Sequence, residues 1–168
     1  GHGHDGSGGL NVTDASNTST EAGAAATIPT PVRPASKLKE VKAEEAWKTP
    51  LNLALFTAQQ YKGKRGYEGK IQAVVFALVE AGELGRATEV ALLFPSEEGD
   101  EALDRVVRAA AESGDAVQAF KVAQWIDEPP ARARALCQAA MAQVKAGDKQ
   151  AALTTIRQAE GLARKIPQ

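Results

Sequence analysis

The chain has 168 residues, about the size of one domain. Charged residues make up 24% and apolar and aromatic residues 43%, as in globular proteins, while aromatic residues alone account for only 5%. Alanine is abundant and has the highest helix propensity, so this composition favours closely packed helices over strands. No apolar run reaches the roughly 18 residues that cross a bilayer, and we expect no transmembrane segment.

Opposite charges are segregated along the chain, although the formal net charge is only −1. Basic residues are in excess in 33–70 and in 129–168, whereas acidic residues are in excess in 71–128. This pattern describes either solvated helix faces or a molecule whose ends and middle attract opposite surfaces. In the second case the charges would steer a partner or a second copy of the chain.

Residues 1–36 have the composition of a flexible leader. They are mostly Gly, Ser, Thr, Ala and Asn and cannot bury enough apolar surface to offset the entropy of ordering. The stretch "IPTPVRP" at 28–34 predicts an extended piece that holds the leader away from the folded part. Leaders of this kind are common in exported bacterial proteins, so we expect a periplasmic or cell-envelope location, with a cytoplasmic one as the alternative.

Residues 37–69 predict a degenerate N-terminal helical pair followed by a basic loop. Ser36 is expected to cap a helix in "SKLKEVKAEEAWKT", and Pro50 to open a second helix in "PLNLALFTAQQYKG". The loop "YKGKRGYEGKI" at 61–71 lacks the Ser or Thr that a phosphate loop needs after its lysine. It is expected to be a plain interhelical loop or, alternatively, an anion or nucleic-acid contact through Lys62, Lys64, Arg65 and Lys70.

A short motif then occurs three times, as "EAGELGRAT", "ESGDAVQAF" and "KAGDKQAAL". Its glycines are 32 and 33 residues apart, and apolar residues precede and follow each glycine at helical spacing. A glycine in the left-handed conformation ends a first helix, and the next residue, Asp115 or Asp148, can cap a second. Five positions after each glycine stands an alanine, which predicts a close helix crossing; the glycines and alanines are Gly82, Gly114, Gly147, Ala87, Ala119 and Ala152.

Over residues 70–166 the chain resembles the tetratricopeptide (TPR) or TPR-like helical repeat family. The glycines match the family's corner between helix A and helix B, and the alanines match its small position. The aromatic residue that usually opens helix A is replaced by Ile71, Leu103 and Leu136. The resemblance implies an all-α, right-handed α-solenoid with three TPR-like hairpins in 70–168, and HEAT-like or Sel1-like repeats are the alternatives.

The resemblance also implies that a partner binds the concave surface formed by the A helices. The positions involved lie ten, six and three residues before each corner glycine. The Lys and Asn residues of the family's carboxylate clamp are missing, so we expect an apolar groove with one Asp–Arg pair, suited to an amphipathic helix or an extended apolar peptide. Alternatively, the apolar members pack against the leader or neighbouring helices. The set is Gln72, Phe76, Val79, Asp104, Arg108, Ala111, Cys137, Met141 and Val144.

The helical region offers no predicted catalytic or metal site. Both histidines, His2 and His4, lie in the leader, so the helices contain neither a base for a nucleophilic triad nor a zinc site. The single cysteine, Cys137, cannot form an intramolecular disulfide, and its spacing is that of a small core residue. A solvated, helix-capping loop is expected at Glu97, Glu98, Asp100 and Glu101.

We therefore predict a protein that is not an enzyme, needs no cofactor, and acts as a scaffold or adaptor that binds another protein or peptide on the A-helix face. The alternative is a structural subunit of an oligomeric or filamentous assembly, held together by the opposite charges of its segments. Nucleic-acid binding through residues 61–70 is a third hypothesis.

Overall fold

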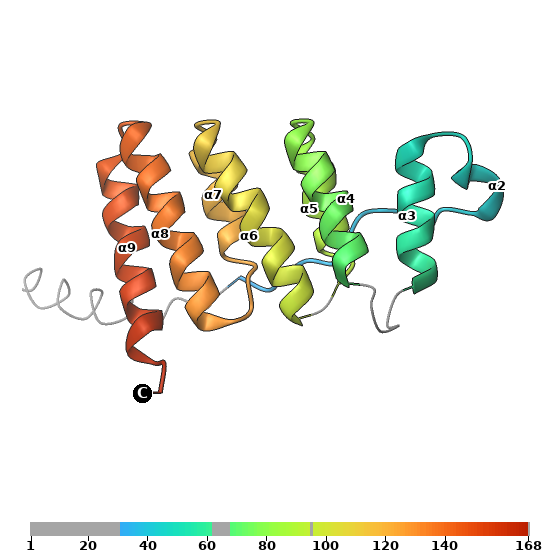
Figure 1. Ribbon diagram of the computed structural model, residues 1–168. Helices are drawn as coiled ribbons and strands as arrows, with labels where there is room; N and C mark the ends of the chain where they lie inside the picture. Colours follow the sequence, from blue (N-terminus) through green and yellow to red (C-terminus); the bar gives the residue numbers. More distant parts are fainter. Residues whose placement is uncertain (1–30, 62–67, 95, 168) are drawn as a thin grey trace, which may run out of the picture. The chain divides into compact units, whose positions relative to one another are not determined.

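The computed structural model describes residues 31–61, 68–94 and 96–167, and every regular element in these ranges is an α-helix. The expectation of an all-α protein is confirmed for this part of the chain (Figure 1). The predicted leader lies outside the described residues as far as residue 30. The helices are α2 (Ala43–Ala46), α3 (Pro50–Tyr61), α4 (Glu68–Glu80), α5 (Leu84–Ala91), α6 (Ser96–Glu112), α7 (Ala116–Ala123), α8 (Pro129–Lys145) and α9 (Lys149–Arg164).

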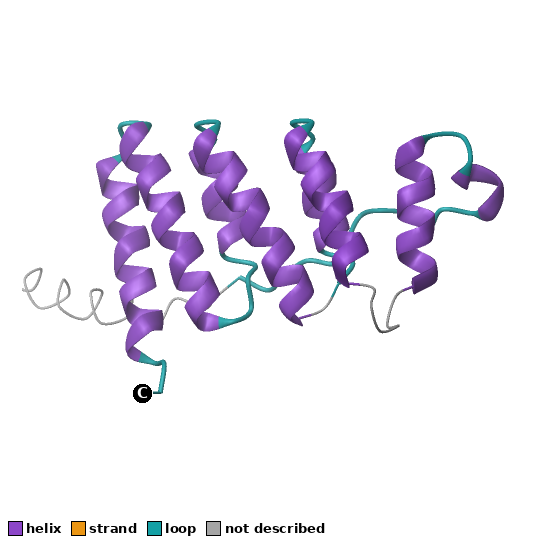
Figure 2. Ribbon diagram, in the orientation of Figure 1, coloured by secondary structure: helices purple, strands orange, loops and turns teal. Residues whose placement is uncertain are grey.

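The same tight turn joins α4 to α5, α6 to α7 and α8 to α9 (Figure 2). Gly82, Gly114 and Gly147 have φ angles of 77°, 83° and 88°, a region that glycine enters without a steric penalty. Each glycine N–H donates to the carbonyl three residues earlier, and the next N–H donates to the carbonyl five residues earlier. This is the Schellman motif, so the prediction that the three glycines end helices is confirmed.

The second helix of each pair is capped in two of the three cases. The Asp115 carboxylate accepts from the Gln118 N–H at 3.1 Å, and the Asp148 carboxylate accepts from the Ala151 N–H at 3.0 Å. Glu83 holds the corresponding position before α5 and makes no such bond. The longer glutamate side chain is a poorer cap, so α5 begins without a side-chain partner for its first N–H groups.

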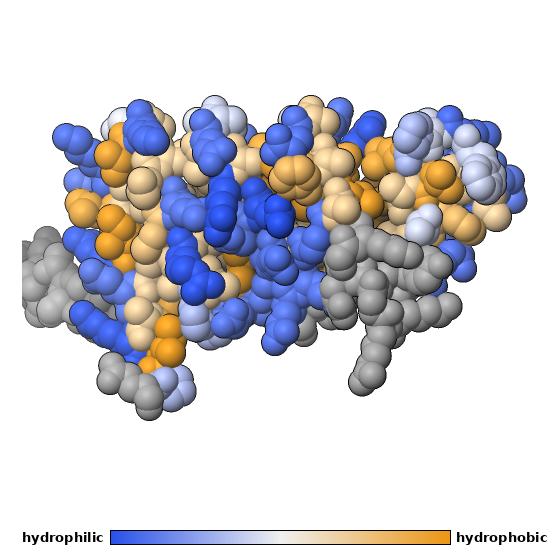
Figure 3. All heavy atoms as spheres, viewed as in Figure 1, coloured by the Kyte–Doolittle hydropathy of each residue, from blue (hydrophilic) through white to orange (hydrophobic). Residues whose placement is uncertain are grey.

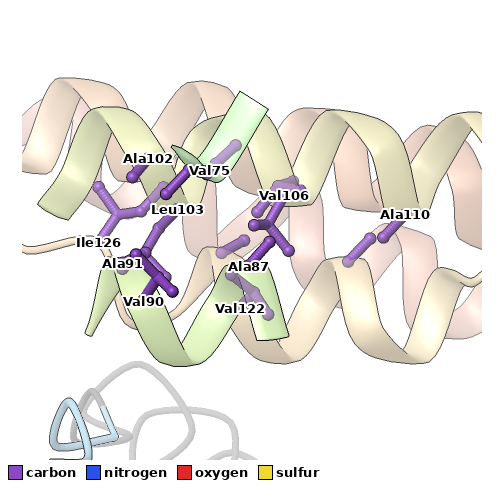
Figure 4. Packing of buried hydrophobic residues seen from close by; sticks show 14 of the residues in the cluster. Val75, Ala87, Val90, Ala91, Ala102, Leu103, Val106, Ala110, Val122 and Ile126 are labelled. Atoms are coloured by element: carbon purple, nitrogen blue, oxygen red, sulfur yellow. The ribbon is translucent and has the colours of Figure 1, made fainter. Parts of the chain in front are cut away.

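Helices α4 to α9 share one apolar core. Each helix contacts the next, and α6 also contacts both α4 and α8. Ala87, Ala119 and Ala152 are fully buried, as the close helix crossings require. Figure 4 shows Leu103 and Ile126 close together within this packing. Residues that are far apart in sequence thus bury one continuous set of side chains.

The N-terminal part departs from the predicted helical pair. Residues 31–42, called the strap below, contain no helix, and α2 is only four residues long. Ser36 therefore does not cap a helix; its hydroxyl donates to the Glu89 carbonyl oxygen on α5 at 2.7 Å. Leu38 and Val41 pack against the core instead, which favours an extended path over a helix. The start of α3 at Pro50 is confirmed, with the Thr49 hydroxyl accepting from the Asn52 N–H at 3.0 Å.

Candidate interaction surfaces

Large apolar side chains of the predicted A-helix face are exposed. Phe76 on α4 is 49% exposed, and on α8 Met141 and Val144 are 62% and 50% exposed. The residue that corresponds to Phe76 and Met141 on α6 is Arg108, which is exposed as well. The described residues thus leave about half of each of these apolar side chains uncovered.

A shallow cleft of about 270 Å³ lies between α4 and α6 on this face. Phe76 and Val79 line it from α4, and Asp104, Arg105 and Arg108 line it from α6. The Arg105 guanidinium carbon lies 5.4 Å from the centre of the Phe76 ring, within the range of a cation–π contact. The cleft thus brings together four residues of the predicted A-helix face, namely Phe76, Val79, Asp104 and Arg108. It also contains Arg105, which does not lie ten, six or three residues before a corner glycine.

The predicted Asp–Arg pair forms within α6. Arg108 Nη2 lies 3.0 Å from a carboxylate oxygen of Asp104, one helical turn away. Because the Arg108 side chain is 63% exposed, solvent screens this pair, and such pairs stabilise a helix by only about 0.3–0.5 kcal/mol. Its main effect is to present both charges at the cleft. Figure 3 shows hydrophilic residues gathered over α6, with apolar residues on both sides.

Gln72 and Cys137 lie differently from their predicted settings. The Gln72 amide nitrogen donates to the Glu98 carbonyl oxygen at 2.9 Å and so ties α4 to the start of α6. Its amide oxygen is buried without a hydrogen-bond partner among the described residues. Cys137 is exposed, so its assignment to the core was wrong. Leu136, its neighbour in sequence, fills the core position, and the helical turn of 100° directs Cys137 outward.

The basic residues of the 61–71 loop cannot be compared with their prediction. Lys62, Lys64 and Arg65 lie outside the described residues, and Lys70 belongs to the first turn of α4. Among the residues that are described, no group of three or more His, Cys, Asp or Glu side chains is arranged to hold a metal ion. No helix in the same ranges is long and apolar enough to cross a membrane.

A second polar site, which the sequence did not reveal, joins the strap to the helices. Asp100, expected to be solvated, is only 5% exposed. Its two carboxylate oxygens accept from the Asp127 and Glu128 N–H groups, both at 3.0 Å, and one of them also accepts from Arg33 Nη1 at 3.0 Å. The prediction of a solvated loop was therefore wrong: Glu97, Glu98, Asp100 and Glu101 belong to α6, and Asp100 is buried against the turn between α7 and α8.

Arg33 completes this site from a part of the chain that was predicted to be leader. Its Nη1 also lies 3.1 Å from a carboxylate oxygen of Asp127, and Nη2 donates to the Phe94 carbonyl oxygen at 2.9 Å. The predicted leader boundary at residue 36 thus falls inside a segment that contacts the helices. The only signal in the sequence was a lone arginine between two prolines, whose partners lie 61 to 94 residues away.

Comparisons with protein-family models, with curated protein sequences and with solved structures give no significant match to this chain.

Proposed function

We propose that this protein is a non-catalytic interaction module that binds an amphipathic helix or an extended apolar peptide of another protein on its A-helix face. The proposal depends on one observation, the exposure of Phe76, Met141 and Val144 on α4 and α8. Full burial of such a side chain contributes about 1.5–3 kcal/mol, so a partner that covers three half-exposed ones gains useful affinity. Arg105, Arg108 and Asp104 between them can set the partner's orientation.

We also propose that α4–α9 are three units of a right-handed, TPR-like α-solenoid. The common turn geometry at Gly82, Gly114 and Gly147 supports this, as do the buried alanines that follow each glycine. In a solenoid, each unit presents its first helix to the same side, so Phe76, Arg108 and Met141 would form one continuous surface. For the location of the protein, we propose export to the periplasm or cell envelope, which fractionation of the source cells would test.

Site-specific photocrosslinking in the source cells tests the binding surface. A photoreactive amino acid is placed at Phe76, Arg108 or Met141, and the matched control position is Trp47, which directly follows α2 and is 80% exposed. We expect one common protein to crosslink from the three A-helix positions and not from Trp47. In the full chain, Phe76→Glu is expected to abolish capture of that protein, since a carboxylate replaces the apolar contact. Equal crosslinking from Trp47, or capture that survives Phe76→Glu, contradicts the proposal.

A second candidate function, a subunit of a larger assembly, is favoured by the outer side of α9. Leu153 and Ile156 are 47% and 37% exposed there. Ile156 corresponds in register to Ala91 and Ala123, both of which are completely buried. We expect light scattering to detect association at low salt, and Ile156→Glu, but not Thr154→Glu, to abolish it. A monomer at every salt concentration excludes this function.

A further inference from the structure

We propose that the pocket around the Arg33 guanidinium is a binding site for the arginine of an extended peptide. Arg33 fills it within the same chain, and a peptide of the same kind supplied by another molecule can replace it. The site is formed by Asp100, Asp127, the Phe94 carbonyl oxygen and Gly99, and is called the arginine slot below. It shares no residue with the A-helix face, so either proposal can fail without the other.

The arginine slot binds the Arg33 guanidinium through two carboxylates and one backbone carbonyl oxygen. The Arg33 side chain is 13% exposed, and the carboxylate of Asp100 beneath it is 6% exposed. The two terminal nitrogens serve different acceptors: Nη1 reaches the two carboxylates, and Nη2 reaches the carbonyl oxygen. A lysine has one terminal nitrogen and cannot make this forked contact, so the slot is selective for arginine.

Gly99 gives the slot its depth. It lies inside α6, where glycine costs helix stability relative to alanine. A Cβ atom built on Gly99 would overlap both the guanidinium of Arg33 and the carbonyl oxygen of Phe94. The missing side chain thus leaves space both for the guanidinium and for the backbone carbonyl oxygen of Phe94 that the guanidinium binds.

The strap beside Arg33 is bound in the manner of a peptide. Two prolines flank the dipeptide of Val32 and Arg33 and hold the backbone extended, which lowers the entropy lost on binding. Three residues further on, the Ser36 hydroxyl donates to the Glu89 carbonyl oxygen, and the Lys37 N–H donates to the Glu89 carboxylate. None of these contacts requires that the strap be part of the same chain.

Space for a longer or differently placed peptide remains next to the strap. A cleft of about 440 Å³ is lined by Pro34, Ala35 and Lys37 of the strap and by side chains of α5 and α7. On the α7 side the cleft is lined by the exposed Val117 and by Trp125, which lies two residues beyond the end of α7 and whose ring centre is 5.6 Å from the Lys121 ammonium nitrogen. A peptide anchored by its arginine in the slot can therefore add apolar contacts on α7.

Peptide binding to the full chain tests the slot. The probe is a fluorescent peptide of residues 31–41, PVRPASKLKEV, measured by anisotropy against the natural chain and its Arg33→Ala variant. Because the variant leaves the slot open, we expect it to bind the peptide at least about tenfold more tightly than the natural chain. A peptide with lysine in place of arginine is expected to bind about tenfold more weakly than the parent peptide.

Matched variants separate the slot from other surface carboxylates. In the Arg33→Ala background, we expect both Asp127→Asn and Asp100→Asn to weaken binding of the peptide, whereas Glu160→Gln, at an exposed position of α9, leaves binding unchanged. Asp127 is largely exposed, so Asp127→Asn keeps the fold if Asp100→Asn does not, and far-ultraviolet circular dichroism checks both. The proposal is overturned if Arg33→Ala binds no better than the natural chain, if both peptides bind equally, or if Glu160→Gln weakens binding as much as Asp127→Asn.

Discussion

The hairpins from α4 to α9 and the segment 31–61 are held in place by different kinds of interaction. In the hairpins, fully buried side chains such as Leu103 and Val106 fill a shared core. The strap is anchored by polar groups at Arg33 and Ser36, and α3 touches α4 only sparsely. A cleft of about 560 Å³ between α3 and α5 separates Leu51 and Leu55 from Arg86 and Val90. The first region is stabilised by packing of neighbouring helices. The second combines these polar contacts with apolar packing of a smaller set of side chains, among them Leu38, Val41 and Leu55, against the same core.

Truncating the core is expected to have the largest effect on stability. Leu103→Ala removes a fully buried side chain that packs between α6 and its neighbours. We expect the free energy of unfolding to fall by about 2–5 kcal/mol, measured by urea denaturation. The control, Leu153→Ala, alters a leucine that is 47% exposed and should cost much less. Equal losses would mean that α4–α9 do not share a continuous core.

Removing the Arg33 anchor is expected to loosen only the N-terminal region. Arg33→Ala leaves the largely buried Asp100 carboxylate with its two backbone donors but without a cation. Loss of hydrogen bonds to charged groups costs about 1.5–3 kcal/mol. Hydrogen exchange should therefore speed up in the strap and in α3, while the amides of α6–α9 stay protected. Faster exchange throughout α6–α9 would show that the strap is part of the same cooperative unit.

The three corner glycines are expected to stabilise the protein because of their positive φ angles, and not because a side chain at these positions would collide with a neighbour. A Cβ atom on Gly114 meets nothing within 4 Å, but its φ of 83° is costly for alanine. Gly114→Ala should therefore lower the free energy of unfolding by about 1–2 kcal/mol. A Cβ atom on Gly161 in α9 also meets nothing within 4 Å, and Gly161 is not among the glycines with positive φ. Gly161→Ala should therefore raise the free energy of unfolding by about 0.5–1 kcal/mol. Thermal melts of both variants would show opposite shifts, and shifts of the same sign would contradict this account.

The smallest expected effect is a gain at the uncapped start of α5. Glu83→Asp places the side chain found at Asp115 and Asp148 before the helix that lacks a cap. We expect the free energy of unfolding to rise by about 0.5–1 kcal/mol, as for other N-caps. Glu80→Asp, inside α4, serves as the control and should give no gain. No change with Glu83→Asp would mean that the first corner differs from the other two in more than its cap.

Local sequence signals were sufficient for the hairpins. The three glycines and the alanines five residues later predicted where helices end and where they cross, because both depend on the conformation and size of single residues. The exposure of Phe76 and Met141 followed from the same helical register. Two expectations conflicted at Cys137. The helical register put it on the outer face of its helix, in agreement with its exposure, whereas its interpretation as a small core residue was wrong because Leu136 fills that core position.

The sequence by itself determined the all-α class, the three corners and the side of each first helix that meets solvent, since these depend on contacts within about one hairpin. Only the tertiary structure decided that residues 37–42 are extended, that Asp100 is buried and that Arg33 is its partner. These features depend on contacts between groups that are 27 to 94 residues apart in sequence, and on Gly99, whose missing side chain leaves space for Arg33. Contacts between residues so far apart, and the space left by a single glycine, produce no periodic pattern in the sequence. They therefore become visible only when the helices are packed together.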